Sequence, residues 1–412
     1  MKNRRPELLI PASSLEVLKT AVVFGADAVY IGGEAFGLRA KAKNFSREEM
    51  EAGILFAHEH GVKVYITVNI LAHNDDLPEA EVYLRELKEI KPDALIIADP
   101  AIYELAKEIC PEIERHISTQ ANNTNYGTYN FWWKQGAKRV VSARELSLKE
   151  IKEIREHIPE EMEIESFIHG AMCISYSGRC LLSNFFTGRD ANRGACTHPC
   201  RWKYSIVEET RPGEYMPVYE NERGTYIFNS KDLCMIEHMD DVLEAGIDSL
   251  KIEGRMKTAL YVATVARTYR KAIDDYLEDP ALYREHMPWY QEQIKSCTYR
   301  QFTTGFFYGK PDETTQIYDN NTYEKGYTYL GYIEEQREDG LYRITQRNKF
   351  LLGETIEVMK PDGRNLRAVV KGIFDEEGQS MESAPHPQQV LYVELDAEVS
   401  VYDILRRREE AS

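Results

Sequence analysis

The feature that most constrains the fold is an alternation of short aliphatic runs with amphipathic helical patterns along the first 170 residues. Strands that alternate with helices in this way are typical of a parallel sheet. The helical patterns include Leu15–Phe24, Arg47–His60, Glu79–Ile90 and Leu148–His157. The strand-like runs are Glu7–Ile10, Ala28–Ile31, Lys63–Val68, Ala94–Ala98, His116–Ser118, Arg139–Val141, Glu163–Ile168 and, much later, Ser249–Ile252 followed by a helical pattern at Ala259–Tyr276. Eight such runs predict an α/β fold of the TIM-type (β/α)8 barrel. No GxGxxG follows the first run to favour a doubly wound sheet.

The seventh and eighth runs are about 80 residues apart, far more than an ordinary connection needs. This insertion, residues 170–248, has a β-hairpin character, with strands expected at Trp202–Glu208 and Tyr226–Phe228. From about Asn321 the runs become short and are separated by turn residues, which predicts a small all-β barrel. The expected strands there are Thr328–Glu334, Tyr342–Thr345, Glu354–Met359, Arg367–Ile373 and Gln389–Leu395. The predicted domains are a barrel at 1–290 with its insertion, a linker at 291–320 and a β-domain at 321–412.

Charge and hydropathy exclude several classes of protein. No apolar stretch reaches the 18 residues of a membrane helix, and the apolar run near the N-terminus, Leu8–Ile10, is too short for a signal peptide. We therefore expect a cytoplasmic protein that does not enter a membrane. The net charge is −17, so any nucleic-acid contact requires a local basic patch.

Four of the seven cysteines, Cys173, Cys180, Cys196 and Cys200, fall within 28 positions. A disulfide framework is improbable in a cytoplasmic chain with an odd number of cysteines. Four thiolates suit either a zinc ion or an iron–sulfur cluster. Six residues separate the first two cysteines, which is loose for a zinc knuckle and fits a larger cluster better. The spacing alone leaves both metals open.

The other three cysteines are not the first candidates for ligands. Cys110 ends a helical pattern and Cys234 lies beside apolar residues, so both are predicted to pack in the core, while Cys297 in the predicted linker is predicted to be a plain thiol. Cys234 is expected at the start of a helix within SKDLCMIEHM, where it is a reserve candidate for a ligand.

Polar residues follow several strand-like runs, where barrel enzymes place their chemistry. His169 follows the seventh run and is a candidate acid, base or substrate ligand. Arg144 and Arg255 also follow strands and together could bind a carboxylate or phosphate, unless they pair with Glu145 or Glu253. We expect His116 and the segment at 119–122 to line the same mouth. The hydrolase motifs HExxH and GxSxG do not occur.

A basic and aromatic segment, KSCTYRQFTTGFFYGK at 295–310, is the first candidate for an RNA-binding patch. Its cations would meet phosphates and its rings would stack on unpaired bases. The alternative is that its aromatic rings pack between domains. A second candidate lies beside the cysteines, at Arg189, Arg193, Arg201 and Lys203.

The stretch from Glu165 to Ser183 resembles the signature of peptidase family U32, the collagenase-like protease family. The matching positions are Glu165, Phe167, Gly170, Ala171, Met172, Cys173, Gly178, Cys180, Leu182 and Ser183. The likeness extends through ADAVYIGG, ISTQAN, NSKDL, SLKIEGR and the C-terminal β-domain. The text around the cysteines looks most like the branch that makes 5-hydroxyuridine in tRNA.

The resemblance implies an oxygen-independent hydroxylation of the wobble uridine, with Cys173, Cys180, Cys196 and Cys200 as ligands of a [4Fe-4S] cluster. It implies prephenate as the co-substrate that supplies the hydroxyl group, and the anticodon region of tRNA as partner, with room for a related partner subunit. Two rival interpretations remain: a U32-type peptidase, and a non-catalytic assembly subunit with a structural metal.

Overall fold

The structure is a computed structural model that describes most of the chain. The described residues are 5–34, 44–173, 175–177, 179–189, 191, 196–202, 205–206, 216–217, 229–310, 316–317 and 326–409. The chain divides into two compact units. One consists of Met1–Leu18, Asp27–Met256 and Arg300–Thr322, and the other of Lys19–Ala26, Lys257–Tyr299 and Tyr323–Ser412.

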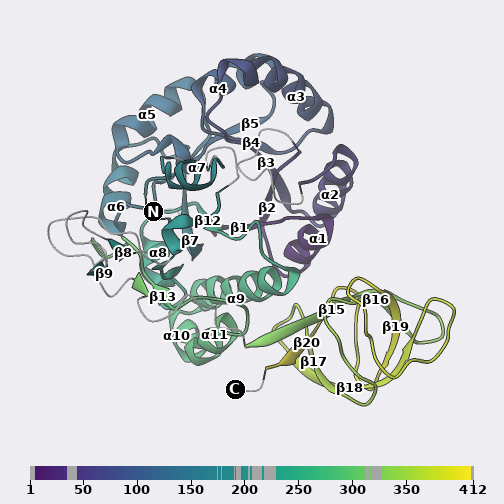
Figure 1. The fold of residues 1–412 in the computed structure, drawn as a ribbon. Coiled ribbons are helices and arrows are strands. Elements are labelled where there is room, and N and C mark those ends of the chain that lie inside the picture. The colour runs from purple at the N-terminus through teal and green to yellow at the C-terminus, as the bar shows by residue number, and fades with distance from the viewer. Residues whose placement is uncertain are drawn as a thin grey trace. The chain divides into compact units, whose positions relative to one another are not determined.

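The first unit is built on the predicted TIM-type barrel. Within the described residues, eight parallel strands follow one another in the order β12-β1-β2-β3-β4-β5-β6-β7, and β7 pairs with β12 to close the ring. Figure 1 shows this ring of strands with helices such as α2 to α6 around it. The strands are β1 (Glu7–Pro11), β2 (Ala28–Ile31), β3 (Lys63–Val68), β4 (Ala94–Ile97), β5 (Glu114–Ile117), β6 (Arg139–Val141), β7 (Glu163–Ala171) and β12 (Ser249–Ile252). The helices are α1 (Leu15–Val23), α2 (Arg47–Glu59), α3 (Leu77–Ile90), α4 (Pro100–Ile109), α5 (Tyr126–Gln135) and α6 (Leu148–Glu156).

Local sequence signals fix where several of these helices begin. Ser46 and Glu49 form a capping box at the start of α2, and Ser147 and Glu150 form another at the start of α6. Asp99 accepts hydrogen bonds from the first turn of α4. Each cap therefore fixes the residue at which its helix begins after the preceding strand.

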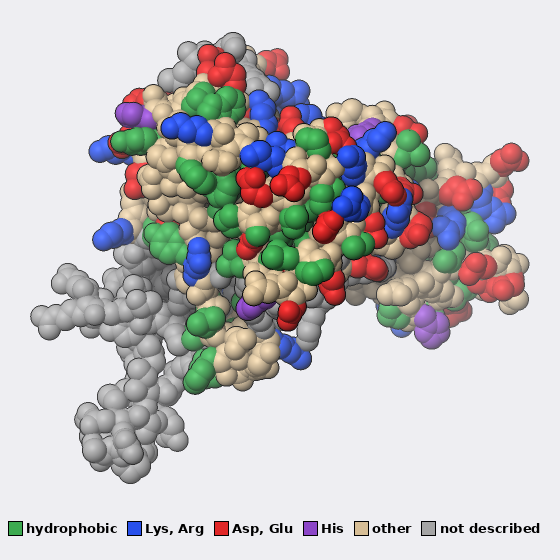
Figure 2. Space-filling model, turned by 90° about the horizontal axis from the view of Figure 1, so that it is seen from above, with side chains coloured by type: hydrophobic (Ala, Val, Ile, Leu, Met, Phe, Trp, Pro, Cys, Tyr) green, Lys and Arg blue, Asp and Glu red, His purple; other side chains and the backbone are tan. Residues whose placement is uncertain are grey.

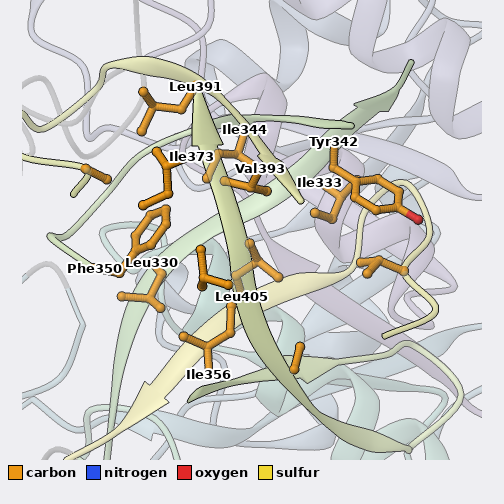
Figure 3. Packing of buried hydrophobic residues seen from close by; sticks show 14 of the residues in the cluster. Leu330, Ile333, Tyr342, Ile344, Phe350, Ile356, Ile373, Leu391, Val393 and Leu405 are labelled. Carbon is orange, nitrogen blue, oxygen red and sulfur yellow. The ribbon is translucent and has the colours of Figure 1, made fainter. Parts of the chain in front are cut away.

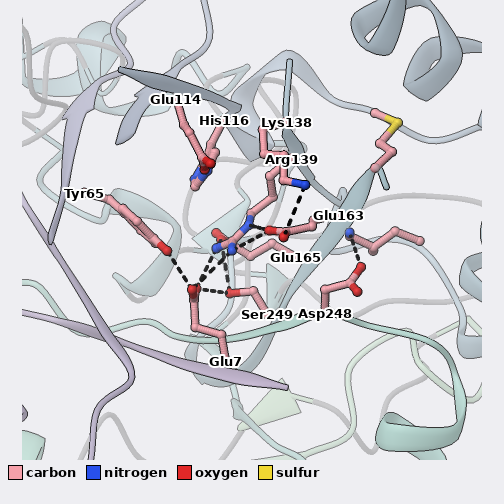
Figure 4. Close-up of polar contacts among 12 residues, drawn as sticks. Glu7, Tyr65, Glu114, His116, Lys138, Arg139, Glu163, Glu165, Asp248 and Ser249 are labelled. Atoms are coloured by element: carbon pink, nitrogen blue, oxygen red, sulfur yellow. Dashed lines mark hydrogen bonds and ion pairs between the residues drawn. The ribbon is translucent and has the colours of Figure 1, made fainter. Parts of the chain in front are cut away.

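The interior of the barrel holds a cluster of charged side chains at the amino ends of its strands (Figure 4). Arg139 is buried, and its guanidinium lies 2.6 Å from Glu7 Oε1, 2.7 Å from Glu163 Oε2 and 3.0 Å from Glu165 Oε2. Burial alone would raise the pKa of Glu7, but the charge and hydrogen bonds of Arg139 outweigh it and lower that pKa to about 2. The cluster therefore satisfies its own charges at the end of the barrel opposite the expected active site.

The chain after β7 departs from the sequence prediction around Cys234. Residues Asp232–Cys234 form a strand, β11, that pairs antiparallel with β7 and parallel with β13 (Phe302–Thr303). The predicted helix at Cys234 is therefore wrong, and the helix that follows, α8, spans Met239–Glu244. The reason is tertiary: β7 continues to Ala171 and offers backbone groups that this segment satisfies.

The insertion contains a short hairpin. Strand β8 (Ser205–Ile206) pairs with β9 (Met216–Pro217), and β8 lies within the strand expected at Trp202–Glu208. The other strand expected in the insertion, at Tyr226–Phe228, lies outside the described residues. Strand β10 (Asn229–Ser230) pairs with β14 (Gln316–Ile317).

The second unit contains the predicted all-β barrel, which six antiparallel strands close among the described residues. Its core includes Leu330, Ile344 and Val393 (Figure 3). The strands are β15 (Tyr327–Gln336), β16 (Tyr342–Thr345), β17 (Thr355–Met359), β18 (Asn365–Phe374), β19 (Val390–Leu395) and β20 (Ile404–Arg408). The same unit includes α9 (Ala259–Glu278), α10 (Pro280–Glu285) and α11 (Met287–Ile294).

Strand β20 is the one strand of this barrel that the sequence analysis missed. Its sequence, ILRRR, carries no alternating pattern of the usual kind. Arg406 is nonetheless 1% exposed, and its Nε donates to Glu357 while Nη1 donates to Ser296. A buried arginine with satisfied donors takes the place of an apolar side chain here.

Candidate functional site

The carboxyl ends of the barrel strands carry the two arginines that the sequence singled out. Arg255 follows β12 and is buried, and its Nη1 donates a 2.6 Å hydrogen bond to Thr67 Oγ1 at the end of β3. A Cβ atom added at Gly32 would lie 2.8 Å from the same nitrogen, so this glycine leaves room for the guanidinium. The Arg255 side chain therefore extends from the end of β12 to the end of β3 at the mouth of the barrel.

Arg144 is held at the same mouth by three contacts. Its Nη1 donates to the carbonyl of Ala171 at 3.1 Å, and its Nη2 lies 3.3 Å from Glu253 Oε2. Its guanidinium also lies 4.0 Å from the centre of the Phe167 ring. Arg144 therefore forms the ion pair with Glu253 that the sequence left open as an alternative. Its Nε is nevertheless buried and has no hydrogen-bond partner among the described residues.

Two amide side chains share one serine hydroxyl just after the carboxyl ends of β3 and β5. Asn69 Nδ2 donates to Ser118 Oγ at 3.3 Å, and Ser118 Oγ donates to Gln120 Oε1 at 2.8 Å. Within the described part of the chain, Asn69 Oδ1 and Gln120 Nε2 are buried without a hydrogen-bond partner. The Ser118 hydroxyl has only one proton to donate. If the oxygen and nitrogen of both amides were exchanged, one amide N–H donor and one amide oxygen acceptor would still lack a partner. Buried polar groups are normally satisfied, and these atoms mark a place for a polar ligand.

The cysteine-bearing segment is tied to this mouth through Asn122. The 3-10 turn η2 (Thr119–Ala121) ends at Asn122, whose Nδ2 donates to the carbonyl of Ser177 at 3.2 Å. Arg179 Nε donates to Asn122 Oδ1 at 2.7 Å. One asparagine therefore fixes the chain between Cys173 and Cys180 next to the tip of β5. This hydrogen-bonding role of Asn122 goes beyond the prediction that residues 119–122 line the mouth.

A second set of hydrogen bonds connects the segment of Cys196 and Cys200 to the helix that follows Cys180. Helix α7 (Leu182–Thr187) starts two residues after Cys180, and its Ser183 Oγ accepts from the backbone N–H of Thr197 at 3.0 Å. Thr197 lies next to Cys196, and the turn η4 (Pro199–Arg201) contains Cys200. Three of the four clustered cysteines thus belong to segments that are joined through α7.

The exposure and arrangement of the thiols bear on whether they could hold a metal centre. All seven cysteines lie among the described residues, and none forms a disulfide. Cys173 and Cys196 are exposed, while Cys180 and Cys200 are half-buried. No three metal-ligating side chains converge on one point within the described ranges. The four thiols are the donor set that an iron–sulfur cluster requires, so the residues present fit such a cluster in chemistry.

Cys110 is 1% exposed, which confirms the prediction that it packs in the interior, and Cys297, predicted to be a plain thiol, is also 1% exposed. Cys234 is also buried, but it pairs directly with His169 across β11 and β7. Directly opposed residues of antiparallel strands place their side chains on the same face of the sheet. Cys234 and His169 are therefore neighbours just before Cys173, and both remain candidates for the site.

Two expectations about the surroundings of the site are wrong. His116 does not line the mouth; it is fully buried in the barrel interior, 4.8 Å from the ring of Tyr65, where burial lowers its pKa. Arg300, expected in an RNA-binding patch, is only 5% exposed, and Phe307 is buried as well. The segment at 295–310 therefore buries part of the basic and aromatic side chains on which the predicted RNA-binding patch depends.

No helix among the described residues has the length and apolar character needed to cross a membrane.

The C-terminal part of the chain, residues 325–406, matches the profile of the peptidase family U32 C-terminal domain. The chain is 42% identical to tRNA hydroxylation protein P1 of Bacillus subtilis, with 98% of this chain and 95% of that protein covered. It is 37% identical to tRNA hydroxylation protein P of Escherichia coli, with 98% and 97% covered.

A further relative, the 23S rRNA 5-hydroxycytidine synthase of Escherichia coli, is 37% identical over 68% of this chain and 41% of its own length. The profile of peptidase family U32 itself matches residues 13–317, which include seven of the eight barrel strands, β2 to β7 and β12, and the cysteine-bearing segment. The chain therefore belongs to peptidase family U32.

Proposed function

We propose that this protein is an RNA-modifying enzyme that hydroxylates the wobble uridine of tRNA to 5-hydroxyuridine without using oxygen. The full-length relatives named for tRNA hydroxylation support the substrate class, and the relative named for rRNA hydroxycytidine synthesis supports hydroxylation of a pyrimidine. The observation that carries the proposal is the pair of hydrogen bonds from Asn122 to Ser177 and Arg179. Through them a cysteine-bearing segment lies beside a mouth with unpaired polar groups.

Cys173, Cys180, Cys196 and Cys200 are the proposed ligands of a [4Fe-4S] cluster. Such a cluster would supply electron transfer next to the mouth of the barrel. Arg144, Arg255 and the amide pair of Asn69 and Gln120 would bind and orient the polar substrates. His169 is the proposed acid, base or substrate ligand at the end of β7.

Hydroxylation at C5 of uracil replaces a C–H bond by a C–OH bond and oxidises the base. With a hydroxyl group supplied at the oxidation level of hydroxide, the base loses two electrons and one proton, so the reaction needs a hydroxyl source and a two-electron acceptor other than oxygen. We propose prephenate as the hydroxyl source, because two arginines at one mouth are suited to a dianionic dicarboxylate, and an oxidised external electron carrier as the acceptor. Arg144 Nε, which has no hydrogen-bond partner among the described residues, supplies a donor for the dicarboxylate.

Mass spectrometry of tRNA nucleosides tests the function directly. A strain that lacks this protein should lose 5-hydroxyuridine and its derivatives, and the wild-type gene should restore them. The gene with Cys173→Ala should not. An unchanged level of 5-hydroxyuridine in the deletion strain would contradict the proposal. Release of peptides from casein or collagen by the purified protein would instead favour the peptidase interpretation. Activity of the purified protein on tRNA, alone or only with a related subunit, decides whether a partner is needed.

Iron content after anaerobic purification tests the ligand set. Cys173→Ala, Cys180→Ala, Cys196→Ala and Cys200→Ala should each lower bound iron sharply, because three thiolates hold a cluster weakly. Cys110→Ala and Cys297→Ala are matched controls that should retain full iron, since both thiols are buried in packing. Full iron in Cys196→Ala together with its loss in Cys234→Ala would transfer the ligand role to Cys234.

A further inference from the structure

An exposed aromatic surface lies beside the cysteines of the first unit. We use this name for the side chains of Tyr176, Leu181, Phe185, Phe186 and Trp202, all of which are exposed. The ring of Phe186 lies 5.3 Å from that of Phe185 and 6.3 Å from that of Trp202, centre to centre. Large apolar side chains that gather on a surface usually mark a binding site.

Helix α7 turns its apolar side chains outward and a polar one inward. Phe185 is 81% exposed, whereas Ser183 on the same helix is fully buried. Ser183 is buried because its hydroxyl binds the backbone of Thr197, and Thr187 Oγ1 donates to the Ser183 carbonyl at 2.7 Å. The hydrogen bonds that hold the cysteine segments together thus fix the orientation of α7. The exposure of the rings follows from the way the cysteine segment is built.

The segment that bears the aromatic surface has a net charge opposite to that of the whole chain. Residues 172–206 contain five basic residues and one acidic residue, a net charge of +4 in a chain of −17. Among these basic residues, Arg179 and Arg189 are exposed. On the face shown in Figure 2, acidic and basic side chains are interspersed. A partner of this surface should therefore be anionic and should present flat apolar faces.

We propose that the aromatic surface stacks unpaired bases of the RNA substrate while the neighbouring arginines bind its phosphates. Aromatic side chains recognise the faces of bases that are free of pairing, and basic side chains follow the backbone. A paired duplex hides those faces, and a protein partner would not need the positive charge. This inference rests on the proposed function and adds to it the surface that holds the nucleotides around the reacting one.

The test uses the full-length protein and an RNA hairpin that carries 2-aminopurine in its loop. Anisotropy of a terminal label measures affinity, and quenching of 2-aminopurine measures stacking. The double variant Phe185→Ala/Phe186→Ala should lose affinity by about tenfold or more and should lose the quenching, because stacking on one aromatic ring accounts for about that factor. Phe185→Trp should retain both signals, since the larger ring still stacks.

Phe131→Ala is the matched control, because Phe131 is 52% exposed on α5. It should bind the hairpin as the wild type does. Arg189→Glu should weaken binding and flatten its dependence on salt, because fewer counterions are released. The wild type should prefer the hairpin to a fully paired duplex of the same composition.

Unchanged affinity and quenching in the double variant would overturn the inference, as would equal affinity for hairpin and duplex. A wild-type dimer that the double variant dissociates, with RNA affinity intact, would assign the surface to contact between copies and would also overturn it. Nucleoside analysis separates this failure from failure of the proposed function. Wild-type 5-hydroxyuridine levels with the double variant refute only the stacking surface, whereas hairpin stacking without any hydroxylated nucleoside refutes only the proposed activity.

Discussion

Lys251 Nζ donates a 2.6 Å hydrogen bond to Glu165 Oε1 in the interior of the barrel, where both side chains are buried. The two residues lie on β12 and β7, the strands whose pairing closes the ring. These strands are also the ones that the cysteine-bearing insertion separates in the sequence. The ion pair therefore links, inside the barrel, the strand that precedes the insertion to the strand that follows it.

Glu165→Gln should lower the free energy of unfolding by about 3 kcal/mol or more, because it leaves the buried Lys251 without a charged partner. The glutamine has nearly the same volume, so no cavity contributes to the loss. Urea denaturation followed by circular dichroism measures the effect. The control is Glu81→Gln, which breaks an exposed pair with Arg85 and should cost less than about 1 kcal/mol. Equal losses in the two variants would refute the prediction.

The low pKa of Glu7 predicts a specific loss of stability in acid. Burial raises this pKa, but Arg139, Tyr65 and Ser249 outweigh burial and lower it from 4.5 to about 2. A carboxylate whose pKa is lowered by folding stabilises the native state above pH 4.5, and this contribution disappears as the pH falls toward 2. The contribution at neutral pH is roughly 3 kcal/mol.

The measurement is the free energy of unfolding of wild type and Glu7→Gln between neutral pH and about pH 3. Glu7→Gln should be less stable at neutral pH and should show a flatter dependence on pH in the acid range. Glu51→Gln, at an exposed pair with Arg47, should leave the curve unchanged. Parallel curves for wild type and Glu7→Gln would show that the carboxylate does not carry this linkage.

Arg144→Lys and Arg255→Lys should each weaken activity on tRNA. Lysine keeps the charge but cannot make the forked contacts of a guanidinium, so we expect a loss of about 2 kcal/mol, or roughly thirtyfold in kcat/KM. Steady-state formation of 5-hydroxyuridine at varied prephenate concentration measures it. Arg47→Lys on the exposed face of α2 is the control. Unaltered kinetics in both mouth variants would exclude the proposed role.

Gly170→Ala should distort the mouth and destabilise the barrel by about 3 kcal/mol. Gly170 has φ of +110°, and an added Cβ would lie 2.5 Å from the carbonyl oxygen of Glu253. Gly188 also has a positive φ, but nothing lies within 4 Å of an added Cβ, so Gly188→Ala should cost only about 1 kcal/mol. Thermal unfolding of both variants gives the comparison. A Gly188→Ala loss as large as that of Gly170→Ala would show that backbone strain, and not the contact, governs the cost.

The candidate site could be predicted from sequence only as a set of positions. Arg144, Arg255 and His169 follow strands, and the fold itself delivers residues in that place to one end of the barrel. The contacts that give the site its chemistry join residues distant in the sequence. Asn122 reaches Ser177, and Ser118 joins Asn69 to Gln120. No local pattern encodes such pairs.

The eight barrel strands, the β-domain and the helices that begin after Ser46 and Ser147 were predictable from residues adjacent in the chain, because periodicity and capping are local. The position of Cys234 in a strand beside His169 and the burial of Arg300 and Arg406 were not predictable in this way, because they arise only when distant segments meet. Each of these outcomes depends on which backbone edge or charged partner meets the residue after folding. Burial of an arginine is favourable only where distant groups satisfy its donors, so its environment follows from the fold rather than from its neighbours in sequence.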